Sequence, residues 1–511
     1  MIKLSGIKIR PFEDDRVLLE KAVKKAGVKK ADVKYFKLVK KSLDARNKSD
    51  IFYSCSVELS LSDYKKPQKV YGKVKRGGEV LVVGMGPAGL FCALDLLRYG
   101  LKVTLIERGK AVDERSNLVD NFIKTCNLNE DCNVQFGEGG AGAFSDGKLN
   151  TGVGGVTARE VIDDFLLFGA PNEIDYLQKP HIGSDKLKGV VKNIRNEIIR
   201  LGGEVLFSTK LTDIEIVSNK VISVTINGEK RVFDEVVLAV GHSARDVYFM
   251  LERRGVAMES KDFAVGLRIE HLQRDINLSQ YGEFAGKKGM PVADYKLTSN
   301  YNGRGVFTFC MCPGGLVMPS TSERETIVVN GMSNFLRDGE NANSAVICQV
   351  TKKDFGTSLF GGVEYQLNLE KKAFSLGGND YRAPSMLVGD YLSGENSQSF
   401  GKVNPSYAMG VKKADLNKLF GEEINLSLKY AISDMGKRLK GFDCYDAVLT
   451  GVESRTSSPI RVLRDETFKS VSANNLYPCG EGCGYAGGIT SAGADGKKVA
   501  KAIAVKYGLE F

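Results

Sequence analysis

Residues 79–90 read EVLVVGMGPAGL, an apolar run that passes into closely spaced glycines and then into an apolar helical pattern. In such a strand, turn and helix, Gly84 permits the tight turn and Gly86 lets the backbone approach a pyrophosphate. Gly89 lets the helix pack closely on the strand. The N–H groups at the helix start then face the phosphates. This stretch predicts a βαβ dinucleotide-binding unit.

The second strand of this unit is expected at residues 102–106, and it ends at Glu107. A carboxylate in this position accepts hydrogen bonds from the ribose hydroxyls of an adenosine and disfavours a 2′-phosphate. We therefore expect FAD or NAD rather than NADP.

The region from residue 190 to residue 241 predicts a helix, a β-meander and a return strand. An amphipathic helix at 190–201 precedes four short strands, near 205–207, 211–217, 221–226 and 231–233. The buried run at 235–240 then stops at Gly241. Near the carboxyl end, a short strand at 475–478 leads into a glycine-rich turn and a helix at about 491–507.

A second glycine-rich stretch, QFGEGGAGAFSDGKLN at 135–150, predicts a loop whose backbone approaches a large planar or phosphorylated ligand. Its two phenylalanines, Phe136 and Phe144, favour a packed loop. Arg115 precedes this loop, and two interpretations stay open for it: an ion pair with a pyrophosphate or a place on a helix surface.

Five stretches together resemble a family of bacterial FAD-dependent dehydrogenases that has the two-dinucleotide-binding fold of the glutathione-reductase superfamily. They are VVGMGPAGL (82–90), GEGGAGAFSDGKLNT (137–151), FTFCMCPGG (307–315), GVESRTSSPIRV (451–462) and PCGEGCGYAGGITSAGADG (478–496). The resemblance covers essentially the whole chain and implies bound FAD and redox chemistry, but no particular substrate.

The resemblance also implies that Glu481 binds the ribityl and phosphate part of FAD, although the usual pattern has aspartate there. The carboxylate of Glu481 reaches one methylene further. The cofactor-binding residues expected from the pattern and the resemblance are Gly84, Gly86, Pro87, Ala88, Gly89, Glu107, Arg108, Arg115, Gly139, Gly140, Ala141, Gly142, Leu211, Gly241, Gly480, Glu481, Gly488 and Ile489.

The expected fold is α/β. It combines a Rossmann-like FAD-binding domain, made of a parallel sheet and a β-meander, with an inserted α+β substrate domain and a small amino-terminal α+β domain. The expected boundaries are 1–76 for the amino-terminal domain, 77–250 and 443–511 for the FAD-binding domain, and 251–442 for the substrate domain.

Positive charge is concentrated at the amino end. Residues 1–75 carry 17 lysines and 3 arginines against 9 acidic residues, a net charge of +11, whereas the whole chain of 511 residues carries +10. Such a patch can attract nucleic acid or another acidic partner. Because no nucleic-acid motif accompanies the charge, a lysine-rich solvated surface is the favoured interpretation and RNA docking the alternative.

Catalytic candidates come from the motifs that lie outside the cofactor fingerprint. Cys312 follows a predicted strand in FTFCMCPGG and could relay electrons or attack a substrate as a thiolate. Tyr485 and Lys148 lie in the flavin segments, and Arg455 could clamp a carboxylate or phosphate. Each also has an ordinary structural interpretation.

Several classes of function are disfavoured. The cysteine spacings match no zinc motif, so no metal is expected. No second GxGxxG lies between a strand and a helix, so NAD(P)H or another electron partner is expected to bind only transiently. The amino end lacks signal-peptide features and no stretch is apolar enough for a membrane span, which favours a cytoplasmic protein with ten reduced cysteines.

The favoured function is an FAD-dependent oxidoreductase that transfers a hydride between a small organic substrate and flavin N5. The alternatives are a flavoprotein that acts on or docks to RNA through its basic domain, and a flavin-binding regulatory protein without turnover. The sequence does not indicate an oligomeric state.

Overall fold

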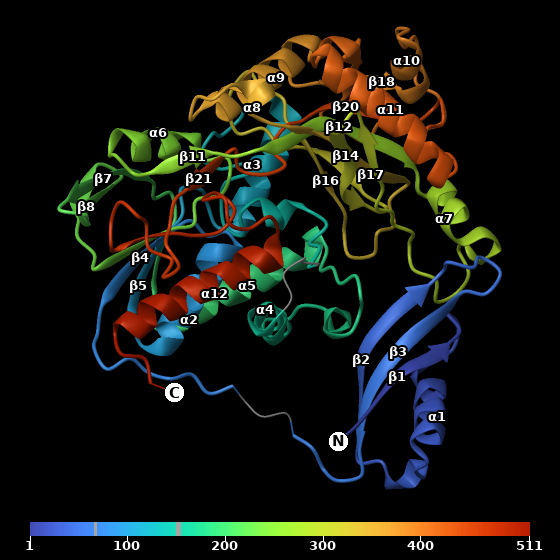
Figure 1. Ribbon diagram of the computed structural model, residues 1–511, viewed down its shortest axis with the longest axis horizontal. Helices are drawn as coiled ribbons and strands as arrows, with labels where there is room; N and C mark the ends of the chain where they lie inside the picture. The colour runs from blue at the N-terminus through green and yellow to red at the C-terminus, as the bar shows by residue number, and fades with distance from the viewer. Residues whose placement is uncertain (66–68, 150–154, 511) are drawn as a thin grey trace.

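The computed structural model describes residues 1–65, 69–149 and 155–510, and two large β-sheets organise it (Figure 1). The last two residues of the motif at 137–151, Asn150 and Thr151, lie outside the described residues. The expected α/β fold is confirmed.

A five-stranded parallel sheet forms the first unit, in the order β22-β10-β4-β5-β6. Helices α2, α5 and α12 pack on one face, against side chains such as Val80 and Val82. The β7-β8-β9 meander and α6 pack on the other, against Leu81 and Val83 (Figure 1). The strands are β4 (Glu79–Val83), β5 (Lys102–Ile106), β6 (Glu204–Leu206), β10 (Glu235–Leu238) and β22 (Leu476–Pro478); the meander is β7 (Leu211–Val217), β8 (Lys220–Ile226) and β9 (Glu229–Arg231); the helices are α2 (Pro87–Tyr99), α3 (Val112–Thr125), α4 (Val156–Leu167), α5 (Ser184–Arg200), α6 (Arg245–Arg253) and α12 (Ile489–Lys506).

One predicted meander strand belongs to the parallel sheet instead. The segment expected at 205–207 is β6, which pairs in parallel with β5 at the sheet edge. Helix α5 is long enough to act as the crossover that brings β6 alongside β5, so the meander begins only at β7.

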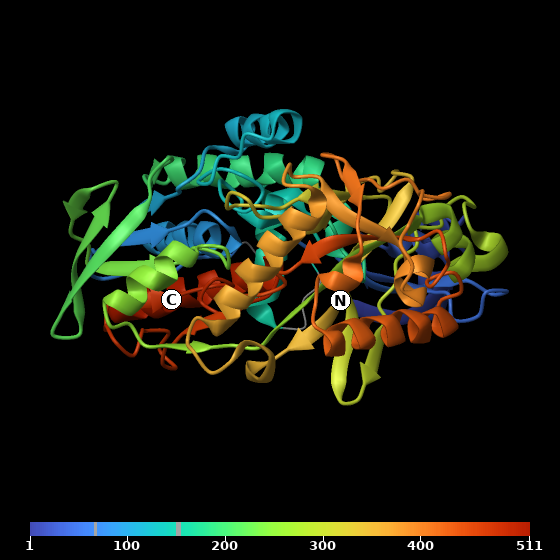
Figure 2. The ribbon, with the colours of Figure 1, turned by 90° about the horizontal axis from the view of Figure 1, so that it is seen from above.

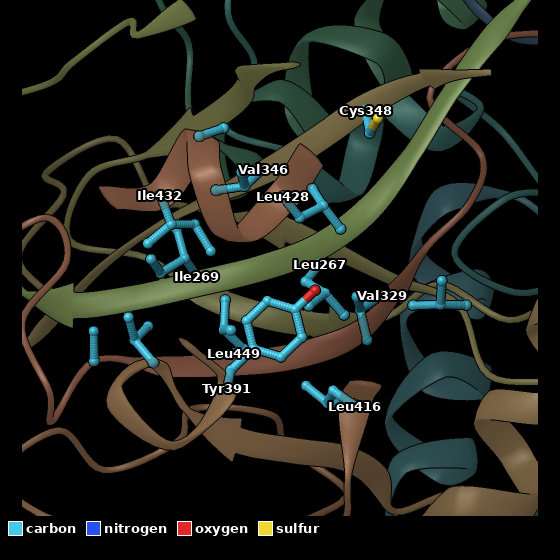
Figure 3. Packing of buried hydrophobic residues seen from close by; sticks show 14 of the residues in the cluster. Leu267, Ile269, Val329, Val346, Cys348, Tyr391, Leu416, Leu428, Ile432 and Leu449 are labelled. Atoms are coloured by element: carbon cyan, nitrogen blue, oxygen red, sulfur yellow. The ribbon is translucent and has the colours of Figure 1, made fainter. Parts of the chain in front are cut away.

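A seven-stranded sheet forms the second unit, in the order β13-β14-β17-β12-β20-β18-β19. Helix α11 packs on it through Leu428 and Ile432, which lie among Ile269, Val346 and Leu449 in Figure 3. The strands are β12 (Phe263–Leu272), β13 (Thr298–Tyr301), β14 (Arg304–Cys312), β17 (Asn341–Val350), β18 (Ala383–Leu387), β19 (Val411–Lys413) and β20 (Val448–Glu453); the helices are α7 (Gln273–Tyr281), α8 (Lys352–Phe355), α9 (Gly361–Gly377), α10 (Val388–Ser393) and α11 (Glu422–Arg438).

Strand β20 lies beyond the expected boundary at residue 442. It pairs with β12 and β18 in the middle of the seven-stranded sheet, so the second unit extends through Glu453. A sequence boundary drawn in the loop before β20 could not show this, because the partner strands lie far away along the chain. Two small ribbons complete the architecture: β11 (Met258–Ser260) with β21 (Ile460–Val462), and β15 (Leu316–Pro319) with β16 (Val329–Met332).

The amino-terminal domain is α+β, as expected, and its strands and helix follow one another in the order βαββ. Strands β1 (Ile2–Ile9), β3 (Phe52–Ser60) and β2 (Tyr35–Asp44) form an antiparallel sheet in that order, covered by α1 (Asp15–Ala26). Asp14 caps α1 by accepting hydrogen bonds from two backbone N–H groups, and Gly27 ends it in the left-handed conformation.

Seen from above, the two large units lie side by side along the long axis (Figure 2), and the amino-terminal domain lies below the seven-stranded unit in the view of Figure 1. Within the described ranges, we find no helix with the length and apolar character needed to cross a bilayer.

Candidate active site

One long cleft runs between the carboxyl ends of β4 and β5 and the seven-stranded sheet. It holds about 1370 Å³ of space not filled by atoms, its open mouth included. Glu107 and Gly86 line it from the parallel-sheet unit, and Phe309 and Glu453 line it from the other unit. A dinucleotide-sized ligand can therefore contact both units at once.

In the turn after β4, the three glycines have the separate structural roles that the sequence predicts. Gly84 has a φ of +101°, and a Cβ at Gly89 would lie 1.9 Å from the carbonyl oxygen of Gly84. A Cβ at Gly86 would meet no protein atom within 4 Å. Gly86 precedes α2, whose first turn has no side-chain cap. The helix start is therefore open to a phosphate group.

Glu107 lies at the tip of β5 and is oriented by backbone donors. Its carboxylate accepts hydrogen bonds from the N–H groups of Met85, Gly109 and Gly137, at 2.9, 2.9 and 3.0 Å. Each carboxylate oxygen can accept more than one hydrogen bond, so Glu107 retains acceptor capacity on its cleft side.

The glycine-rich loop after residue 135 is held by a buried cation. Arg115 is fully buried and donates hydrogen bonds to five backbone carbonyls, those of Asn133, Val134, Gly137, Glu138 and Gly140. Arg115 does not line the cleft, and it does not lie on a helix surface either. Its side chain lies instead at the centre of the loop and holds the loop together, since each of its guanidinium nitrogens donates to backbone carbonyl groups.

Glu481 lines the cleft from the turn after β22. Among the described residues no group hydrogen-bonds or ion-pairs with its carboxylate, and burial raises its pKa to about 7, partly offset by the charge of Lys261. Close by, Gly488 and Ile489 line the cleft at the start of α12, which also has no side-chain cap. A half-buried acid without a partner and two uncapped helix starts facing one cleft fit a ligand that carries phosphate and hydroxyl groups.

Most of the expected cofactor residues line this cleft. They are Gly84, Gly86, Pro87, Ala88, Glu107, Arg108, Gly140, Ala141, Gly142, Leu211, Gly241, Glu481, Gly488 and Ile489. Gly89, Gly139 and Gly480 lie behind the lining, where they allow close packing. A Cβ at Gly480 would lie 2.7 Å from that of Ala88, and one at Gly139 would lie 3.0 Å from that of Ala143.

Two of the expected catalytic residues lie away from the cleft. The hydroxyl of Tyr485 donates to the carbonyl of Val462 and accepts from the N–H of Arg464, whose guanidinium lies 3.6 Å from the ring centre. Cys312 is fully buried behind the cleft wall. Neither side chain lines the cleft, because the hydroxyl of Tyr485 is hydrogen-bonded within the fold and Cys312 is covered by the cleft wall.

Lys148 and Arg455 are already paired within the chain. The ammonium of Lys148 lies 3.1 Å from Asp146 and 4.0 Å from the sulfur of Cys312. Arg455 lines the cleft, but it holds the carboxylate of Glu370 at 3.0 and 2.8 Å rather than a free anion. Arg455 therefore clamps a carboxylate, as expected, but this carboxylate belongs to Glu370 of the same chain.

Glu370 is the centre of a buried cluster that the sequence did not indicate. Arg245 and Arg455 both bind its carboxylate, and Ser454 donates to it at 2.8 Å. Burial alone raises the pKa of Glu370, but the two guanidinium groups overcome this and lower it to about 2. They also act on His242 at the cleft wall: burial and both positive charges lower its pKa to about 4, so its imidazole is neutral at pH 7.

Sequence reasoning missed three further lining residues of the second unit, Cys310, Asn330 and Glu453. Cys310 belongs to the same CMC motif as Cys312, and the sequence alone carries no signal that distinguishes the two cysteines. Arg268, which is fully buried, ties the three together: it pairs with Glu453 at 2.8 Å and donates to the side chain of Asn330 and the carbonyl of Cys310. Among the described residues, no group of three metal-ligating side chains occurs.

The comparisons with known proteins agree with this geometry. The family model described as "FAD-dependent protein, C-terminal domain-like" matches residues 262–456, and the pyridine nucleotide-disulphide oxidoreductase model matches residues 78–265. A domain of unknown function matches residues 1–60. A protein of Clostridium beijerinckii, named only as uncharacterized, is 44% identical over 99% of either chain.

Solved structures show distant likenesses. A flavin-dependent brominase is 14% identical, with coverage of 84% of this chain and 80% of that one and a TM-score of 0.39. A glycine oxidase from Bacillus cereus is 12% identical, with coverage of 84% and 95% and a TM-score of 0.32.

The two matching models together span the parallel-sheet unit and the seven-stranded unit, and the cleft between them has the open helix starts and the unpartnered acid that FAD requires. FAD is the cofactor. The chain belongs, with the Clostridium beijerinckii protein, to a family of FAD-dependent oxidoreductases.

Proposed function

We propose that the protein is an FAD-dependent dehydrogenase that transfers a hydride between a small organic substrate and N5 of the flavin. The observation that carries the proposal is the continuity of the cleft, which joins the dinucleotide turn at Gly86 to the wall formed by Phe309 and Asn330. A cofactor held by its adenosine and pyrophosphate at the Gly86 turn would extend its flavin half toward the second unit, where a substrate can enter.

The chain holds the cofactor by groups that are already oriented. Glu107 and the helix starts at Gly86 and Gly488, which line the cleft, would hold the adenosine ribose and the phosphates, and Glu481 would meet the ribityl chain. The bound FAD supplies two-electron redox chemistry. Orientation by fixed donors and acceptors lowers the cost of arranging substrate and cofactor for reaction.

The substrate end of the cleft combines one apolar surface with polar groups that are fixed by their neighbours. Phe309 provides the apolar surface. Asn330 accepts a hydrogen bond from Arg268 at 3.1 Å, and the hydroxyl of Thr456 donates to the carbonyl of Ala264 at 2.7 Å. Glu453 and Arg455 are both paired within the chain. This wall favours a substrate that is recognised by hydrogen bonds and packing rather than by a free counter-charge.

His242 is the residue we assign to a hydrogen bond with the substrate. Its ring is neutral at pH 7, its Nδ1 lies 3.0 Å from the hydroxyl of Ser243, and it lines the cleft. A neutral imidazole donates a hydrogen bond from one nitrogen and accepts one at the other, whereas a pKa of about 4 makes it a weak proton acceptor at pH 7.

An anaerobic absorbance experiment tests the proposal. We expect the purified protein to be yellow, and one member of a panel of amino acids, hydroxy acids, unsaturated acids, NADH and NADPH to bleach the flavin bands. A yellow protein that dithionite bleaches but no panel member does would favour a binding role without turnover. Steep loss of RNA binding with added salt would favour the alternative in which the basic domain docks RNA.

A further inference from the structure

Cys310 and Cys312 occupy an irregular strand at the wall of the cleft. The register of β14 against β17 shifts between Phe309 and Cys312, and Cys310 has a φ of +43°. Non-glycine residues rarely adopt positive φ, and a bulge re-aims the side chain that it carries. As a result, Cys310 lines the cleft while Cys312 lies fully buried directly behind it.

The two thiols are linked to each other and to positive charge. The sulfur of Cys312 donates to the carbonyl oxygen of Cys310 at 3.3 Å, and the ammonium of Lys148 lies 4.0 Å from that sulfur. Arg268 donates to the same carbonyl at 2.9 Å. Space around the pair is closed, because a Cβ at Gly331 would lie 2.8 Å from the sulfur of Cys312.

These neighbours shift the pKa values of the two thiols in opposite directions. A hydrogen bond between the two thiol side chains, together with the charges of Lys148 and Arg268, outweighs burial and lowers the pKa of the Cys310 thiol. The same hydrogen bond and burial raise the pKa of Cys312 well above its ordinary value. One thiolate facing the cleft and one protonated thiol behind it are the two partners that disulfide formation needs.

Other cysteines provide a contrast within the same molecule. Cys479 and Cys483 lie near the Glu481 turn, but both are buried and burial raises the pKa of each thiol. Cys310 is the one cysteine among the described residues that line the cleft.

We propose that Cys310 and Cys312 form a dithiol–disulfide pair that exchanges two electrons with the bound FAD. The thiolate of Cys310 and the thiol of Cys312 form one sulfur–sulfur bond and lose two electrons and the proton of Cys312. Oxidised FAD accepts the two electrons and one proton, so charge and atoms balance between the two sides. The pair depends on the proposed function only because both use the same bound FAD. It stores two further electrons beside the cofactor.

Electron counting tests the pair in the full-length holoprotein. We expect anaerobic dithionite titration to require four electrons per FAD in the native protein and two in Cys310→Ser and Cys312→Ser variants. Cys348→Ser is the matched control, since Cys348 is buried on the adjacent strand β17 away from the cleft, and it should still take four.

Peptide mass spectrometry gives a readout that is independent of turnover and of the variants. After air oxidation and denaturation, we expect residues 310 and 312 of the native protein to resist alkylation and their shared peptide to be two hydrogens lighter; dithionite should restore both thiols. Removal of FAD before oxidation should slow formation of the disulfide.

The outcomes separate this inference from the proposed function. Two electrons per FAD with ten alkylated cysteines in the air-oxidised protein would overturn the pair, even in an enzyme that a substrate bleaches. Four electrons per FAD with no organic donor able to bleach the flavin would contradict the proposed dehydrogenase and support the pair.

Discussion

A single methyl group at Gly86 tests how closely the chain approaches the pyrophosphate of FAD. The backbone there is extended and a Cβ would meet no protein atom, so Gly86→Ala should leave the melting temperature of the apoprotein unchanged. Since the methyl group enters the space that the phosphates need, we expect FAD affinity to fall by about tenfold or more, which equals about 1.4 kcal/mol.

Flavin fluorescence titration measures this loss of affinity. Gly77→Ala, at an exposed glycine whose added Cβ also meets nothing within 4 Å, is the matched control. Gly89→Ala should instead lower the stability of the apoprotein, because its Cβ would overlap the carbonyl of Gly84. Unchanged FAD affinity in the Gly86 variant would contradict the assigned phosphate position.

Glu370 makes the stability of the second unit sensitive to acid. The pKa of its carboxyl is about 2 in the folded chain against an ordinary value of 4.5. Its charge therefore contributes stability that is complete above about pH 4.5 and is lost as the pH falls toward 2. We expect Glu370→Gln to cost roughly 3 kcal/mol or more at pH 7, since two buried guanidinium groups lose their counter-charge.

Urea unfolding at several pH values checks this expectation. The difference in unfolding free energy between native protein and variant should shrink as the pH falls from 4.5 toward 2. Glu364→Gln, on the exposed side of the same helix, should show a small difference at every pH. A constant difference across this range would mean that Glu370 is not ionised in the folded protein.

At the scale of elements, the packing of α12 on α2 connects stability to the cofactor site. Gly496 lets the helices approach, because a Cβ there would lie 2.1 Å from the carbonyl of Ala88. Beside it, the buried ammonium of Lys497 lies 3.0 Å from both carboxylate oxygens of Asp95 and also pairs with Asp164 of α4. One cation thus joins three helices.

Lys497→Met should destabilise the protein by about 1.5–3 kcal/mol, the range for lost hydrogen bonds to a charged group, because Arg98 still pairs with the buried carboxylates of Asp95 and Asp164. Calorimetry of the apoprotein measures the effect, and Lys498→Met, at the adjacent exposed position, is the matched control. Equal melting temperatures for the two variants would show that the buried pair contributes nothing net. The FAD content should fall with stability, since α12 starts at the cleft.

Sequence patterns predicted the elements whose signal is local. The turn at Gly84, the strand that ends at Glu107 and the Glu481 turn are each encoded within a few residues, and the structure brings all three to one cleft. The pairing of Arg455 with Glu370 could not be predicted, because the two residues come from different elements and meet only through the tertiary fold. The bulge that turns Cys310 toward the cleft depends on the register of β14 with β17, which a single strand does not reveal.

At the scale of the whole molecule, the amino-terminal domain contacts both large units. Its Lys37 pairs with Asp175 of the parallel-sheet unit at 2.8 Å. Its Tyr53 donates to the carbonyl of Gly289 in the seven-stranded unit at 3.1 Å. The domain contributes no described residue to the cleft lining.

Deletion of residues 1–60 should therefore lower the melting temperature and leave the FAD content near that of the native protein. The ratio of flavin to protein absorbance and differential scanning fluorimetry measure the two effects. Loss of the flavin with the domain would show that it maintains the relative position of the two units on which the cleft depends. Lys3→Met, at an exposed ion pair within the domain, is a control that should change neither quantity.

The order of the cleft residues along the chain also determines when each wall of the cleft is synthesised. Gly86 and Glu107 emerge early, whereas Glu481, Gly488 and Ile489 are made about 400 residues later. At translation rates of roughly 5–20 residues per second, the turn at Gly86 is made on the order of 20–80 s before the residues that form the opposite wall of the cleft. A growing chain therefore cannot close around FAD until residues 481–489 have been made, and flavin uptake follows their synthesis.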